Sequence, residues 1–171
     1  PAERLDRLRA ELALPAEARV VLYMGRLMQT KGVLDLVDAA ARLATSAHDV
    51  HLVVAGQGPM EEAMRRRAAA RGIATRIHLL GWRDDGVDLM HLADVLALPS
   101  TYREGLPTVL MEAGAAGRPV VAYRNRGSDD IIADGETGLS VPAGDVPELA
   151  DALARVLDDA DAIICVDCNE T

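Results

Sequence analysis

The chain has 171 residues, half of them hydrophobic, which suffices for one domain with a substantial core but not for two. Its 27 acidic and 18 basic side chains give a formal net charge of −9, which argues against binding driven by nucleic-acid phosphates. No apolar run approaches the roughly 20 residues of a membrane span, and the first residues lack a secretory signal. We therefore expect a cytoplasmic location.

Short apolar runs alternate along the chain with segments of helical periodicity. Strands are predicted at 19–25, 50–56, 76–81, 94–100, 118–123 and 138–142. Helices are predicted at 31–45, 59–71, 86–92, 107–117, 128–133 and 145–158. Most strand segments are nearly continuous Val, Leu and Ala, as expected for strands covered on both faces. The alternation predicts an α/β fold with a doubly wound parallel sheet, in which ligands bind beyond the carboxyl ends of the strands.

The loop after the first predicted strand, "GRLMQTKG", carries two cations next to a helix start. Thr30 is a reasonable N-cap, which would place Lys31 in the first helical turn and Arg26 in the loop before it. Cations there oppose the helix dipole at a cost of about 0.3–1 kcal/mol each. If a diphosphate bound here, the two cations would become favourable, because they would attract its negative charge. The alternative is that both are solvated surface residues.

The loop after the second predicted strand, "GQGPME", contains Gly56 and Gly58. Glu61 stands where a dinucleotide-binding fingerprint has its third glycine, so NAD or FAD binding is not expected. The first loop also departs from the P-loop pattern. The two glycines indicate a tight strand-to-helix turn that still allows a ligand to approach the backbone.

Two glutamates flank the start of the predicted helix at 107–117. The core stripe of this helix is predicted to be Leu106, Val109, Leu110, Ala113 and Gly117. Glu112 borders that stripe and can face a cleft, whereas Glu104 precedes the helix. Carboxylates accept hydrogen bonds from sugar hydroxyls, and the backbone N–H groups of Gly105, Leu106 and Thr108 are free to donate. Two alternatives stay open, a glycosidase acid and base or simply exposed charges.

The motifs "GRLMQTKG", "VVAGQGP", "LGWRDD", "PSTYREGLPTVLMEAGAAGRPVVA" and "DGETGLSVPAGD", in this order, resemble the C-terminal donor-binding domain of retaining GT-B glycosyltransferases of family 4. The resemblance implies that Arg26 and Lys31 hold the donor diphosphate. It also implies that Glu112 binds the ribose, that Glu104 lies by the donor sugar, and that the loop of Trp82 and Arg83 lines the base. The donor-site residues expected on this basis are Gly25, Arg26, Lys31, Gly56, Gly58, Trp82, Arg83, Glu104, Gly105, Leu106, Pro107, Thr108 and Glu112, with Arg26, Lys31 and Glu104 as the catalytic candidates.

The resemblance also implies what the protein works with. The donor, a nucleoside-diphosphate sugar, is a substrate, and neither a cofactor nor a metal is expected because fixed cations neutralise the leaving diphosphate. Cys165 and Cys168 have metal or redox spacing, but no histidine pair matches them, and an inert tail is the alternative. In "RNRGSDDII", Arg126 and Asp130 replace the usual glycine and glutamate, which is expected to tune donor choice.

The expected partner is an acceptor-binding N-terminal domain or subunit, through which the protein could be peripheral to a membrane. We expect one domain at 1–160, with a linker helix region at 1–17, and a tail at 161–171. Without the acceptor half we expect the chain alone to be inactive as a transferase. Two alternatives are a stand-alone nucleotide-sugar-binding subunit or sensor and, less favoured by the loop pattern, a nucleotide-sugar epimerase.

Overall fold

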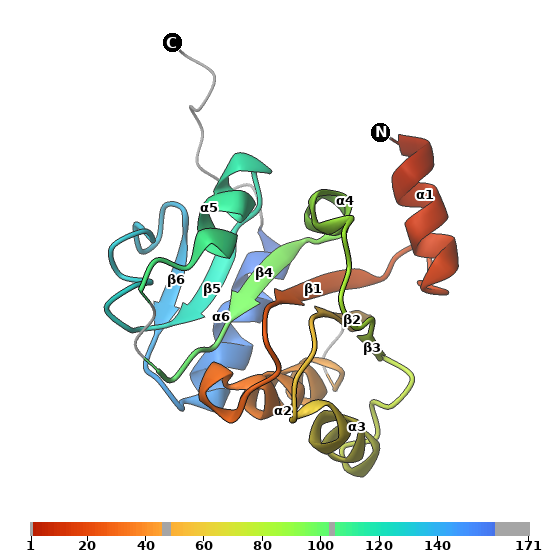
Figure 1. Cartoon of the computed structure of the whole chain (residues 1–171), viewed down its shortest axis with the longest axis horizontal. Coiled ribbons are helices and arrows are strands. Elements are labelled where there is room, and N and C mark those ends of the chain that lie inside the picture. Colours follow the sequence, from red (N-terminus) through yellow and green to blue (C-terminus); the bar gives the residue numbers. More distant parts are fainter. Residues whose placement is uncertain (1, 46–48, 103–104, 160–171) are drawn as a thin grey trace.

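The computed structural model describes residues 2–45, 49–102 and 105–159 (Figure 1). Six parallel strands form one sheet in the order β3-β2-β1-β4-β5-β6. The strands are β1 (Arg19–Met24), β2 (Val50–Ala55), β3 (Ile77–Leu79), β4 (Val95–Leu98), β5 (Val120–Tyr123) and β6 (Gly138–Val141). The helices are α1 (Ala2–Glu11), the 3-10 helix η1 (Gln29–Lys31), α2 (Val33–Leu43), α3 (Glu61–Ala70), α4 (Gly86–Leu92), α5 (Thr108–Ala115) and α6 (Val146–Asp158).

The sheet lies between two layers of helices. Helix α2 packs against α3 and α6 on one face, and α4 packs against α1 and α5 on the other (Figure 1). Every residue of β2, β4 and β5 is buried, as their continuous apolar runs predicted. The expected doubly wound parallel α/β fold is therefore confirmed.

The strand order reverses direction between β1 and β4. Strand β1 pairs with β2 on one side and with β4 on the other, so the chain winds outward from the centre of the sheet twice. The loop after β1 leads to α2 on one face, and the loop after β4 leads to α5 on the other. Such a reversal opens a crevice at the carboxyl ends of the two central strands, where ligands of doubly wound proteins bind.

The helix predicted at 128–133 is wrong, because residues 128–131 form a turn and 132–133 have no regular structure. The Asn125 side-chain oxygen accepts hydrogen bonds from the backbone N–H groups of Gly127 and Ser128. The Ser128 hydroxyl donates to the carbonyl of Tyr123 at 2.9 Å. Short polar side chains that bond to nearby backbone in this way compete with helix formation, and here they fix a turn after β5.

A pair of histidines at the β2–β3 edge is expected to make the free energy of unfolding depend on pH. His51 Nδ1 lies 2.9 Å from His78 Nε2 with the two rings stacked, and His51 is buried. Burial lowers the pKa of both rings, and for His51 this outweighs the Asp49 carboxylate 3.6 Å away. A histidine with a lowered folded-state pKa binds more protons when unfolded, so the free energy of unfolding should fall as pH drops below about 6.5.

Urea unfolding between pH 8 and pH 5 measures this dependence. The double variant His51→Gln/His78→Gln should flatten the slope of the free energy of unfolding against pH. Equal slopes in the wild type and the double variant would show that the pair does not titrate on unfolding.

Candidate functional site

Three loops at the carboxyl edge of the sheet are bonded to one another through their backbones. Leu27 N–H donates to the Gln57 carbonyl at 2.9 Å, and Met60 N–H donates to the Leu27 carbonyl at 3.0 Å. On the other side, Thr101 N–H donates to the Thr30 carbonyl at 2.9 Å. The loop after β1 is therefore held between the loops after β2 and β4, its two neighbours in the sheet.

Glycines make these close approaches possible. A Cβ atom on Gly56 would lie 1.8 Å from the Gly25 carbonyl oxygen, and one on Gly58 would lie 2.3 Å from the Leu27 carbonyl oxygen. Any larger residue would push the first two loops apart. Gly56 and Gly58 thus have a structural role in joining the loops, and their predicted proximity to a ligand stays a prediction.

The loop at residues 25–32, which carries Arg26 and Lys31 and which we call the cation loop, differs from its prediction in one detail. Lys31 ends the 3-10 helix η1, and Gly32, in the left-handed region at φ 64°, is the N-cap of α2. Thr30 is therefore not the cap; its carbonyl instead accepts bonds from Ser100 and Thr101. Lys31 precedes the helix rather than lying in its first turn, yet it remains on the side of the positive helix end.

The Arg26 side chain is exposed, and its backbone carbonyl is bound by a buried tyrosine. The hydroxyl of the fully buried Tyr23 donates to the Arg26 carbonyl at 2.8 Å. Within the described part of the chain, no carboxylate pairs with the Arg26 guanidinium. The sequence analysis did not single out Tyr23, because a tyrosine in an apolar strand resembles a core residue. Its hydroxyl group, in an otherwise hydrocarbon strand, was the feature that could have indicated a nearby hydrogen-bond partner.

A hollow of about 530 Å³ lies where β1, β2 and β3 end, and we call it the carboxyl-edge pocket. Its volume is within the range of small-molecule sites. It brings together five predicted residues and three that were not predicted. The predicted ones are Gly25, Arg26, Gly56, Trp82 and Arg83, and the others are Met24, Ala55 and Gln57.

Trp82 and Arg83 differ in how they are held at this pocket. The Trp82 side chain is 71% exposed, which leaves its ring available to a ligand. Arg83 is held by two carboxylates: Nε and Nη2 donate to Asp85 at 2.8 and 2.6 Å, and Nη1 donates to Glu11 at 2.7 Å. These bonds raise the pKa of Arg83 and lower the pKa of Asp85.

The glutamate region is only partly described. Glu104 lies outside the described residues. Glu112 is exposed on α5, and no described residue bonds to its side chain. The structure does not bring Glu112 into the carboxyl-edge pocket, although the loop before α5 contacts the cation loop at Thr30.

The predicted core stripe of α5 is right at Val109, Leu110 and Ala113 and wrong at Leu106 and Gly117, which are exposed. Leu110 and Ala113 are buried and Val109 is partly buried, while Gly117, at φ 63°, closes the helix. Leu106 is 63% exposed because α5 begins two residues later, at Thr108. The donor-site candidates Gly105 and Thr108 are also exposed, and Pro107 is buried.

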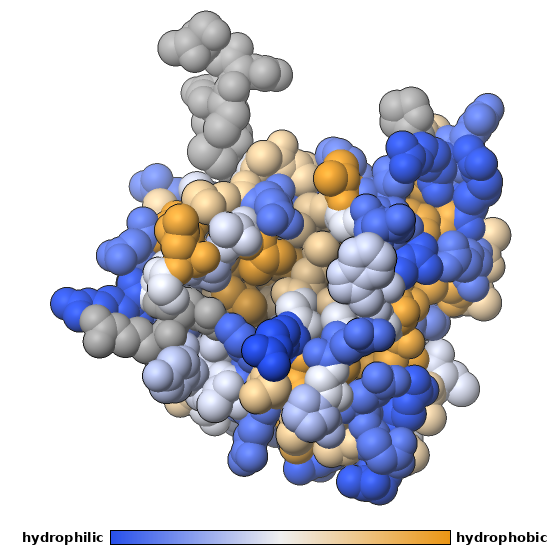
Figure 2. Space-filling model, viewed as in Figure 1, coloured by the Kyte–Doolittle hydropathy of each residue, from blue (hydrophilic) through white to orange (hydrophobic). Residues whose placement is uncertain are grey.

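Exposed apolar side chains gather on the helix layer of α4 and α5. Figure 2 shows hydrophobic surface there between hydrophilic regions, and the large exposed residues include Val87, Leu106 and Met111. This face lies beside the loops at the carboxyl edge (Figure 1).

Comparison with known proteins decides the family. A family model described as "Glycosyl transferases group 1" matches residues 5–170. The chain belongs to the group 1 glycosyltransferases. It is 37% identical over 142 residues to the alpha-D-kanosaminyltransferase of Streptomyces kanamyceticus, covering 82% of this chain and 36% of that protein. It is 39% identical over 162 residues to the D-inositol 3-phosphate glycosyltransferase of Corynebacterium efficiens, covering 90% and 38%.

Solved glycosyltransferases of the GT-B fold share its architecture. The Anabaena Alr3699/HepE protein, determined in complex with UDP-glucose, superposes with a TM-score of 0.87 at 27% identity, over 95% of this chain and 45% of that one. WaaG, a glycosyltransferase involved in lipopolysaccharide biosynthesis, gives a TM-score of 0.82 at 26% identity, over 95% and 44%. This group 1 glycosyltransferase chain thus spans less than half the length of these relatives.

Two further observations concern only the described residues of this chain. Their longest helix, α6, has 13 residues, and none qualifies as a bilayer span. They contain no cluster of three or more side chains suited to hold a metal ion. Cys165 and Cys168 lie outside the described residues, so their predicted alternatives stay open.

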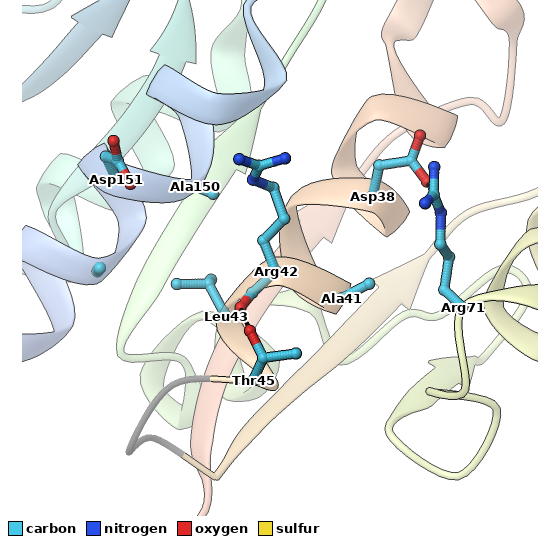
Figure 3. Close-up of a pocket in the computed structure, with 9 residues that line it drawn as sticks. Asp38, Ala41, Arg42, Leu43, Thr45, Arg71, Ala150 and Asp151 are labelled. Atoms are coloured by element: carbon cyan, nitrogen blue, oxygen red, sulfur yellow. Dashed lines mark hydrogen bonds and ion pairs between the residues drawn. The ribbon is translucent and has the colours of Figure 1, made fainter.

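A second hollow of about 530 Å³ lies between α2, α3 and α6 (Figure 3). None of the predicted site residues lines this hollow. Its least exposed charged group, the Asp38 carboxylate, is already paired with arginines. Asp38 on α2 accepts bonds from Arg67 at 2.7 Å and from Arg71 at 2.8 Å. These bonds tie α2 to α3, so we assign the cluster a structural role in this chain.

Asp38→Asn should lower the free energy of unfolding by about 1–2 kcal/mol, because it removes a carboxylate only 16% exposed that serves two arginines. Chemical denaturation measures the change. Asp151→Asn is the control, since Asp151 lines the same hollow from α6 but is exposed (Figure 3). It should stay within about 0.5 kcal/mol of the wild type. Equal effects of the two changes would contradict the structural role of Asp38.

Proposed function

We propose that this chain is the donor-binding domain of a retaining glycosyltransferase, which transfers a sugar from a nucleoside-diphosphate sugar to an acceptor such as a glycan or a lipid-linked saccharide. The observation that carries the proposal is the carboxyl-edge pocket at the ends of β1, β2 and β3. There an exposed arginine, an exposed tryptophan and the backbone of two glycines surround one hollow. The complexes of Alr3699/HepE with UDP and UDP-glucose support the same class of ligand here.

In the proposed reaction the diphosphate is the leaving group. Arg26, at the pocket, and Lys31, next to the positive end of α2, would neutralise the charge that develops on the diphosphate oxygens as the bond to the sugar breaks. This role of fixed cations is why we propose no bound metal and no cofactor. Because the charge grows in the transition state, the two cations would accelerate transfer as well as bind the donor.

The remaining groups would orient the donor. The base would lie against Trp82 and Arg83, where the exposed indole offers a stacking surface. Glu112 would accept hydrogen bonds from the ribose, and Glu104 would lie by the transferred sugar. The backbone N–H groups of Gly105, Leu106 and Thr108 would donate to sugar or phosphate oxygens. These assignments follow the family pattern that the sequence resembles.

The acceptor site belongs, in this proposal, to a second domain or subunit. The chain covers 36% and 38% of the two curated relatives described above, which leaves room for such a domain in proteins of their length. The chain alone should therefore bind the donor and transfer sugar negligibly. Adding the acceptor half should restore turnover.

A thermal-shift panel of UDP-, GDP- and ADP-sugars tests donor binding. A ligand at 100 times its Kd should add about 2.7 kcal/mol to the free energy of unfolding, which is readily seen as a rise in Tm. Stabilisation by one nucleotide class would also identify the base. No shift with any of the three classes at millimolar concentration would contradict the proposal, and efficient transfer by the chain alone would contradict the need for an acceptor half.

A further inference from the structure

Helix α1 is tied to the carboxyl-edge pocket by a long-range ion pair. Glu11, at the end of α1, binds Arg83 Nη1 at 2.7 Å, and the two residues are 72 positions apart in the sequence. Arg83 is itself a residue of the pocket and directly follows Trp82. The Glu11 carboxylate therefore acts on the pocket through Arg83, without lining the pocket itself.

The helix that carries Glu11 has a defined position. It packs against α4, where Arg4 pairs with Asp88, and Leu8 is buried. The connection from α1 to β1 is braced by Arg9, whose guanidinium donates to the carbonyls of Pro15, Ala16 and Ala18. A shift of α1 would thus be carried to Arg83 through Glu11.

The charges at Arg83 point to a positioning role. Two carboxylates surround one guanidinium, so the cluster of Glu11, Arg83 and Asp85 has a net charge of −1, which disfavours a phosphate at this end of the pocket. Three of the five N–H donors of Arg83 are used, and its side chain is only 23% exposed. The guanidinium is held in place and shapes the wall beside Trp82.

We propose that Glu11 is a positioning residue for donor binding, which couples the placement of α1 to the nucleobase end of the carboxyl-edge pocket through Arg83. This inference rests on the proposed function. Asp85 cannot supply the same coupling, because it is two residues from Arg83 and only shapes the loop locally. Removing the Glu11 charge leaves the Arg83–Asp85 pair in place and weakens the link to α1 by replacing an ion pair with, at most, a neutral hydrogen bond.

The experiment compares Glu11→Gln with Glu3→Gln, using the 171-residue chain. Glu3 lies on the same helix, is exposed and forms no ion pair with a described residue, so the control removes the same charge without the link. Calorimetry measures binding of UDP, GDP and ADP, of the matching nucleosides and of inorganic pyrophosphate. Trp82 is the only tryptophan, so its fluorescence anisotropy and quenching by acrylamide report on the pocket wall directly.

Glu11→Gln should weaken the nucleotide and its nucleoside about two- to fivefold by equal factors, the size expected for a partly exposed ion pair. Pyrophosphate affinity should not change, and Trp82 should become more mobile and more easily quenched. Glu3→Gln should match the wild type throughout. An equal loss of nucleotide and pyrophosphate affinity, or no loss in Glu11→Gln, would overturn the inference alone. Failure of the wild type to bind any of the nucleotides would overturn the proposed function, and this inference with it.

Discussion

Gly32→Ala is expected to lower the free energy of unfolding by about 3 kcal/mol or more, the range of exceptional single substitutions. A Cβ atom at this position would lie 1.9 Å from the carbonyl oxygen of Pro99, a backbone atom that cannot move aside as a side chain can. The residue also has φ 64°, which is unfavourable for alanine. The loops after β1 and β4 would have to separate, and α2 would lose its N-terminal geometry.

Gly72→Ala separates the two causes. Gly72 has a similar φ of 74°, but no atom lies within 4 Å of a Cβ placed there. This control should cost only about 1 kcal/mol, from the left-handed conformation alone. Chemical denaturation of both variants gives the difference, which measures the steric overlap at Pro99. If Gly32→Ala were no less stable than Gly72→Ala, the close packing of the two central loops would be incorrect.

Arg26→Ala should weaken binding of the preferred nucleoside diphosphate by about 1.5–3 kcal/mol, the usual contribution of a hydrogen bond to a charged group. The thermal stability of the unbound protein should not fall, because the exposed guanidinium has no carboxylate partner among the described residues. Lys31→Ala should weaken binding by a similar amount. The difference in nucleotide affinity between the wild type and each variant should become smaller at high salt. Dissolved ions screen the attraction between the side chain and the bound phosphate, so the wild type gains less from it.

Arg66→Ala is the matched control for charge. Arg66 lies on α3, is 70% exposed and, among the described residues, pairs with Glu62 at 3.4 Å on the surface. The variant Arg66→Ala removes one positive charge from the protein, as Arg26→Ala does, yet it should leave nucleotide affinity unchanged. Calorimetry with UDP, GDP and ADP makes the comparison. Equal affinity of Arg26→Ala and the wild type would return Arg26 to the class of solvated surface cations.

The fold was largely predictable from the sequence, because burial imposes local patterns. All six predicted strands are present, and their apolar runs arise from a sheet covered on both faces. The errors lie where side chains compete with the backbone or where an element begins. Asn125 and Ser128 replace a predicted helix by turns, and Gly32 rather than Thr30 caps α2.

The candidate site was predictable in its residue types and only partly in its contacts. Gly25, Arg26, Gly56, Trp82 and Arg83 were predicted and share one pocket, but the ties of Arg83 to Glu11 and of Tyr23 to Arg26 were not foreseen. Nothing in the local sequence around Arg83 indicates a partner 72 residues away.

The sequence by itself determined the order and type of the main elements, the positions of the cations and the glycines in the strand-to-helix loops. Only the tertiary structure decided which loops meet, through the strand order that sets β1 beside β4 and Gly32 against Pro99. The physical reason is the distance along the sequence over which each kind of interaction acts. Periodicity and capping act within a few residues, whereas the contacts that build the pocket join segments whose neighbours are chosen by the packing of the whole sheet.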